Sequence, residues 1–137
     1  MPAIPQSPDN LLAFRYLTGT NFEDNITAFA GGGQASAYQL SGQMSRITTV
    51  ASGADSVALP KAILVGIGDS RPGALGFLAF VRNDGANAMQ VFGATPDTIN
   101  GAATGTGVSV GAGKSALFWL HSISAAGVGS WLMLLSA

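Results

Sequence analysis

The feature that most constrains the fold is a series of short apolar runs, separated by turn residues, that begins near residue 46. β-branched residues dominate Arg46–Val50. In Ser56–Pro60 larger and smaller side chains alternate. Both patterns are typical of strands. Leu75–Val81 is a continuous apolar run of strand length. Runs of this length and spacing predict an all-β domain, either a β-sandwich of jelly-roll type or a small barrel.

A turn follows the third run at Asn83-Asp84-Gly85, and the pair Asp-Gly is among the strongest signals for a β-hairpin. We therefore expect Ala88–Phe92 to return as the antiparallel neighbour of Leu75–Val81. Residues 61–73 are expected to form a loop. Further strands are predicted around Thr98–Ile99, Val108–Val110, Ser115–Leu120 and Trp131–Leu135, separated by glycine-bearing turns.

The first part of the chain has a different character. Three prolines near its start and the triple glycine Gly31–Gly33 interrupt regular structure. We expect residues 1–45 to form an irregular arm and lead-in, and residues 46–137 to form the β domain. Such an arm can become ordered when it binds a partner. The apolar groups through which we expect the arm to attach to a partner are Leu11, Leu12, Phe14, Tyr16 and Phe22.

Composition bears on the kind of partner. Charged residues make up only 9% of the chain, against about 25% in an ordinary soluble domain. Hydrophobic residues make up 47%, and the formal net charge is −1. A nearly neutral, charge-poor surface is best accommodated by burial between subunits, so we expect a homotrimer. The few basic residues are scattered singly, which argues against nucleic acid as a partner.

The segment Ala116–Ala137 contains no charged residue, so a membrane span has to be considered. Its middle, Ser122–Ser130, is small, polar and broken by glycine. Two buried strands joined by a turn explain this pattern better than a span does. We therefore expect no membrane partner.

Sequence motifs for catalysis are weak. Gly107–Ser115 superficially resembles a phosphate-binding loop, but Val108 stands where a glycine is required and a strand is expected to follow instead of a helix. A glycine turn with a solvated Lys114 is the favoured interpretation. His121 is the only histidine, and the carboxylates are dispersed. We expect no enzymatic activity, no metal site and no cofactor.

Two other sets of residues have structural interpretations. Asp55, Asp84 and Asp97 stand at expected turns, where a carboxylate usually accepts hydrogen bonds from turn amides. Six aromatic residues lie within apolar runs and are expected mainly in the core, although together they could form a sugar-binding platform: Phe77, Phe80, Phe92, Phe118, Trp119 and Trp131. The neighbours Phe118 and Trp119 must point to opposite faces of a strand, so one of them faces outward. The residues proposed for a subunit interface are Phe118, Trp119 and Trp131.

Two segments, Arg82–Phe92 and Asp97–Gly101, resemble small structural proteins of tailed-bacteriophage virions. The resemblance extends over about residues 30–137. Its upstream part includes Gly31–Ala37, Arg46–Val50 and Asp55–Pro60. Proteins with such modules serve as head-decoration, head-fibre and tail-associated proteins, commonly as trimers.

The resemblance implies a head decoration (cement) protein on the capsid surface of a virion. Such a protein would bind the major capsid protein as a homotrimer and stabilise the assembled lattice by mass action. A tail or fibre protein that binds a receptor or carbohydrate is the first alternative. A carbohydrate-binding module and a hydrolase that uses the scattered aspartates are further alternatives, and both lack a convergent site in the sequence.

Overall fold

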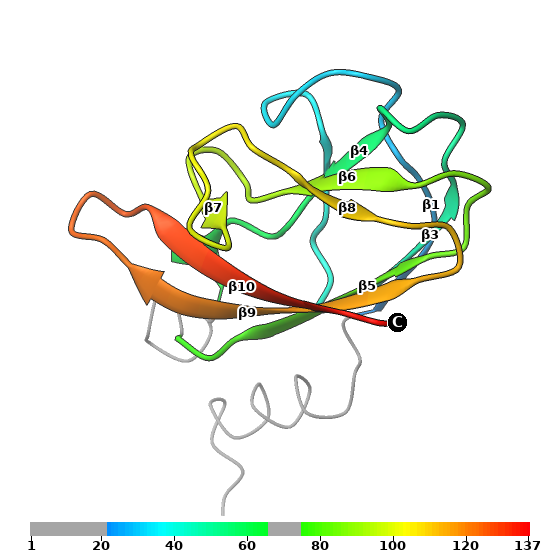
Figure 1. Ribbon diagram of the computed structural model, residues 1–137. Coiled ribbons are helices and arrows are strands. Elements are labelled where there is room, and N and C mark those ends of the chain that lie inside the picture. Colours follow the sequence, from blue (N-terminus) through cyan, green and yellow to red (C-terminus); the bar gives the residue numbers. More distant parts are fainter. Residues whose placement is uncertain (1–21, 66–74) are drawn as a thin grey trace, which may run out of the picture.

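The computed structural model describes residues 22–65 and 75–137, and the regular secondary structure of these ranges is almost entirely β-strand. In chain order the elements are β1 (Phe22–Thr27), β2 (Tyr38–Gln39), β3 (Met44–Thr49), β4 (Ser56–Ala58), the 3-10 helix η1 (Ala62–Leu64), β5 (Leu78–Asn83), β6 (Met89–Phe92), β7 (Thr98–Ile99), β8 (Val108–Val110), β9 (Ser115–Ile123) and β10 (Gly129–Leu135). They form a six-stranded sheet, β1-β3-β5-β9-β10-β7, and a four-stranded sheet, β2-β4-β6-β8. In Figure 1 the strands β4, β6 and β8 lie above β5, β9 and β10.

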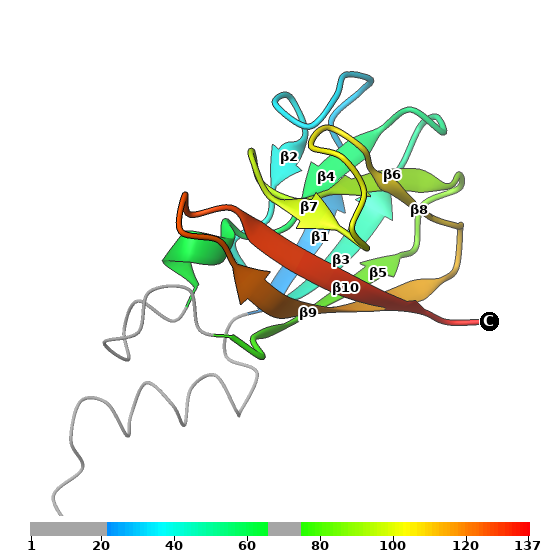
Figure 2. The ribbon, with the colours of Figure 1, turned by 60° about the vertical axis from the view of Figure 1, so that its left-hand side comes forward.

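From β1 to β6 the chain alternates between the two sheets. β1, β3 and β5 run parallel to one another in the larger sheet, and β2, β4 and β6 do the same in the smaller one. β9 and β10 then form an antiparallel pair beside β5, as Figure 2 shows. The all-β prediction is confirmed, and both sheets contain parallel as well as antiparallel pairs.

The hydrophobic core draws on both sheets. β5 and β9 alternate between buried and more exposed positions, so Val81 and Phe118 point inward. Val57 and Val91 meet them from the smaller sheet. Trp131 of β10 is fully buried, and its ring meets Phe77 edge on with 6.3 Å between the ring centroids.

The predicted hairpin at Asn83-Asp84-Gly85 is wrong, because β5 and β6 belong to different sheets. The buried Asn83 side chain explains the path of the chain. Its amide donates to the carbonyls of Asn87 and Val110, and its oxygen accepts from the Gly85 amide. Since Val110 lies in the smaller sheet, these bonds direct the turn across the core. A Cβ at Gly85 would lie 2.7 Å from the Val50 Cβ, so the turn also packs closely.

The predicted boundary at residue 46 is also wrong, because the domain includes residues 22–45. β1 pairs with β3, and Ile26 and Leu40 are buried in the core. The Glu23 carboxylate accepts hydrogen bonds from the amides of Ser41 and Gly42, at 2.7 and 2.8 Å, and so ties β1 to the start of β3. The strand was missed because most of its side chains are polar and exposed. The proposed arm residues Leu11, Leu12, Phe14 and Tyr16 lie outside the described residues.

Two predictions for the C-terminal part are confirmed. The charge-free segment forms the antiparallel strands β9 and β10, joined by a turn at Ser124–Val128. The glycine-rich string before it is a turn, in which the Lys114 amide donates to the Gly111 carbonyl and Gly113 has a φ of 70°. β9 follows this turn directly.

In the part of the chain that the structure describes, no helix is long and apolar enough to cross a membrane.

Candidate interaction surface

Five apolar side chains form one continuous row across the outer face of the six-stranded sheet. Each lies opposite the next in the register of the paired strands. The positions that follow them in β3, β5 and β9 are buried, so the row faces away from the core. This apolar row consists of Phe22, Met44, Phe80, Leu117 and Leu134.

A second apolar row runs beside the first. Trp119 of β9 lies opposite Leu78 of β5 on one side and Leu132 of β10 on the other. These positions are two residues from those of the apolar row on the same strands, so they share its face. We call the two rows together the outer apolar face.

Exposed apolar side chains are concentrated on this face. In the described ranges eleven large apolar side chains are exposed, and five of them belong to the two rows. Phe22 is 53% exposed, Phe80 41% and Leu134 58%. The apolar row lines a shallow groove of about 520 Å³. Contiguous apolar surfaces of this kind are often functional, so this face is the candidate interaction surface.

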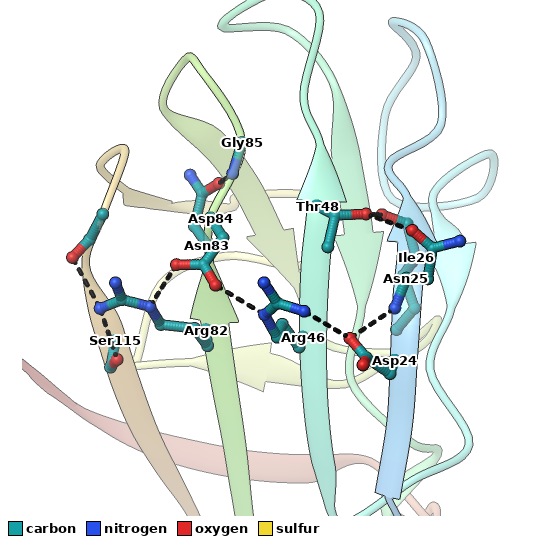
Figure 3. Close-up of polar contacts among 11 residues, drawn as sticks. Asp24, Asn25, Ile26, Arg46, Thr48, Arg82, Asn83, Asp84, Gly85 and Ser115 are labelled. Atoms are coloured by element: carbon teal, nitrogen blue, oxygen red, sulfur yellow. Dashed lines mark hydrogen bonds and ion pairs between the residues drawn. The ribbon is translucent and has the colours of Figure 1, made fainter.

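A charged row borders the apolar row on its other side. It consists of Asp24, Arg46, Arg82 and Asp84 (Figure 3). Arg46 and Arg82 lie opposite each other in β3 and β5, an arrangement in which like charges repel. Asp84 offsets this repulsion because its two oxygens each accept from one guanidinium Nε, at 2.6 Å in both cases. Arg46 also reaches the Asp24 carboxylate, at 3.1 Å.

The ion pairs shift the acid-base properties of the charged row. The hydrogen bond from Arg46, followed by that from Arg82, lowers the pKa of Asp84 below its ordinary value. The same contact with Asp84, followed by that with Asp24, raises the pKa of Arg46. All four side chains of the charged row are paired with one another within the chain.

The structure separates the three aromatic residues proposed for a subunit interface. Phe118 and Trp131 are fully buried between the sheets, so their assignment to an interface is wrong. Both occupy inward positions of their strands, where a large ring fills the core. Trp119 points the opposite way from Phe118, as expected for neighbours in a strand, and lies half-buried on the outer apolar face.

Two aromatic residues have other positions than expected. Phe80 was predicted in the core but is exposed, because Ala79 and Val81 take the inward positions of β5. Phe22 was assigned to the arm but begins β1 and ends the apolar row.

Met44, Leu117 and Leu134 were not singled out from the sequence. The available signal was that parts of β5, β9 and β10 are apolar at consecutive positions, a pattern typical of strands covered on both faces.

The three turn aspartates have three different roles. Asp55 accepts from the Ala51 and Ser52 amides and from the Ser52 hydroxyl, as predicted, and the hydroxyl contact is the main cause of its lowered pKa. Asp84 belongs to the charged row instead. Asp97 is buried and accepts from two amides distant in sequence.

Metal-binding side chains do not cluster in the described residues. No three of their His, Asp or Glu side chains are placed to hold a metal ion together. Comparisons with protein-family models, with curated proteins and with solved structures found no match. The outer apolar face and the resemblance noted in the sequence are therefore the observations that bear on function.

Proposed function

We propose that this chain is a structural protein of a tailed-phage virion, specifically a head decoration protein that binds the assembled capsid as a homotrimer. The observation that carries the proposal is the outer apolar face, an exposed apolar surface on the larger sheet of a two-sheet domain. Its partners would be the major capsid protein and further copies of the chain. The location would be the capsid surface, and the two packed sheets would correspond to the sandwich form of such modules.

The features of the outer face suit binding better than turnover. A catalytic site requires a nucleophile, base or metal in a concave site, whereas the groove here is lined mostly by aliphatic and aromatic side chains. Cementing needs only that the protein binds the assembled lattice in preference to free subunits. In this proposal the outer apolar face would supply the contact between copies of the chain, and residues 1–21 would supply the contact with the lattice.

The N-terminal residues would provide attachment to the capsid. Leu11, Leu12, Phe14 and Tyr16 precede β1, and β1 lies at the edge of the six-stranded sheet. Chain that enters the domain at an edge strand can reach a neighbouring molecule without crossing the core. This division assigns attachment to residues 1–21 and the fold to residues 22–137.

The test is to locate the protein in particles. Cryo-electron microscopy and antibody labelling of phage particles that contain the protein should place it at regular positions on the head. Particles assembled without it should release their DNA at a lower temperature than complete particles. Antibody confined to the tail would contradict the decoration role and favour the receptor-binding alternative.

A further inference from the structure

The edges of the two sheets are poorly suited to binding a second chain through strand addition. The smaller sheet ends in β2 and β8, which have two and three residues, and the larger sheet ends at β7 with two residues. β7 pairs only with Ser130 and Trp131, so Leu132–Leu135 of β10 form a further edge, where the Asn100 side chain accepts from the Met133 amide. β1, the opposite edge, is longer but has two register shifts, and Asn25 within it has a φ of 57°. Short and bulged edges discourage edge-to-edge pairing. A sheet face is therefore the better surface for association.

The outer apolar face has a suitable size for an interface between copies. From the exposed fractions of its five most exposed side chains, the apolar surface is on the order of 500 Å². A stable interface covers about 800 Å² on each partner, including its polar rim. The outer apolar face, with the charged row as part of its rim, approaches this value. Permanent contacts between identical chains are also more apolar than transient contacts.

The charges around the face favour a copy of the same chain over a charged partner. Both arginines of the charged row are paired with its aspartates, so the row has no net charge to attract an acidic or basic surface. The whole chain has a formal net charge of −1, so copies repel each other weakly. A neutral rim around an apolar centre is compatible with an identical rim.

We infer that the outer apolar face is the surface through which copies of this chain bind one another, with Phe80 and Leu117 at its centre. The inference deepens the proposed function, since it assigns a surface to the self-association within it. It leaves capsid attachment to other residues.

Oxidative footprinting of the full chain tests which surface is covered. Met44 lies on the outer apolar face and Tyr38 lies in β2, and both are 40% exposed in the single chain. In the assembled protein Met44 should react with hydroxyl radicals severalfold more slowly than in a dissociated variant, while Tyr38 should react at the same rate. Protection of Met44 in a protein that sediments as a monomer would overturn the inference, because the chain itself would then cover the face.

A matched pair of substitutions tests the energetic role of the face. Phe80→Ser should weaken association by about tenfold or more, measured by sedimentation, because Phe80 is central to the apolar row. Phe29→Ser removes a phenylalanine of similar exposure, 49% against 41%, that lies away from the face, and should leave association unchanged. If Phe80→Ser fails to fold, Leu134→Ser takes its place in the comparison. Dissociation by Phe29→Ser alone would overturn the inference.

The outcomes separate the inference from the proposed function. An intact oligomer with Met44 protected, on a protein absent from phage heads, would contradict decoration and support the interface. A monomer with Met44 freely reactive would contradict the interface, whatever its location in the virion.

Discussion

At the scale of single residues, Asp97 connects parts of the domain that are far apart in the sequence. It is 1% exposed, and its carboxylate accepts from the Ala62 amide at the start of η1 and from the Gly129 amide at the start of β10, each at 2.8 Å. Its backbone carbonyl accepts from the Gln34 side chain at 2.7 Å. The carboxylate therefore provides acceptors for two buried donors that sheet pairing does not satisfy.

We expect Asp97→Asn to lower the free energy of unfolding by about 1–3 kcal/mol. Asparagine keeps one oxygen, but its NH₂ group would face one of the two amide donors and leave it unsatisfied. Urea unfolding at neutral pH measures the loss. Asp24→Asn is the control, since this carboxylate is exposed and should contribute less. An equal loss of unfolding free energy in both variants would show that the burial of Asp97 does not cause the loss of stability.

The charged row predicts a specific dependence of stability on acid. The pKa of Asp84 in the folded protein lies below the ordinary value of 3.8. A carboxyl with a lowered folded pKa stabilises the fold above its unfolded pKa, and this contribution disappears as the pH falls through the folded value. Between about pH 5 and pH 2 the Asp84→Asn variant should therefore lose less stability than the unaltered chain. Urea midpoints across this range check the prediction, and parallel curves for the two proteins would contradict it.

At the scale of elements, periodicity identified the strands from β3 onward but not β1 and β2, and it did not identify which strands pair. Ser115–Leu120 was predicted as a strand and lies within β9, and Leu75–Val81 overlaps β5. The hairpin after β5 was wrong because its turn sequence reports local backbone preference, whereas the buried Asn83 side chain bonds Val110 of the other sheet. A contact between positions so far apart leaves no periodic signal.

The outer apolar face was hidden in the sequence for a related reason. Its two rows combine residues of five strands, and they become rows only through the register of the pairs, such as Met44 opposite Phe80. The sequence did indicate that Phe118 and Trp119 face opposite ways, since that follows from the strand alone. It could not indicate which of the two faces the core, because both faces of β9 are apolar.

The two sides of the larger sheet should respond differently to truncation of an aromatic ring. Trp131→Ala removes a fully buried side chain and should lower the free energy of unfolding by about 3–5 kcal/mol. Phe80→Ala removes one that is 41% exposed, so its loss should be clearly smaller. Denaturant unfolding of both variants at low protein concentration, where self-association contributes least, measures the difference. A larger loss for Phe80 would contradict the outward placement of its ring.

At the scale of the whole molecule, the alternation of the chain between the sheets makes β1 a structural part of the domain. β1 covers one edge of β3, and Ile26 on β1 and Ala28 just after it are buried in the core that both sheets share. The larger sheet presents its other face outward, with the apolar row beginning at Phe22. Removing residues 1–21 leaves this arrangement complete, whereas removing residues 1–30 takes away a strand and the first member of the row.

We therefore expect the two truncations to differ in stability and to agree in function. The chain without residues 1–21 should unfold cooperatively and self-associate like the full chain. The chain without residues 1–30 should be less stable by at least about 2 kcal/mol, because losing the buried Ile26 alone costs about 2–5 kcal/mol. Neither should occupy phage heads, since both lack Leu11, Leu12, Phe14 and Tyr16. Unfolding and sedimentation measure the first two properties, and binding to particles measures the third. Occupancy at the level of the full chain by the shorter truncation would show that attachment uses the β domain instead of residues 1–21.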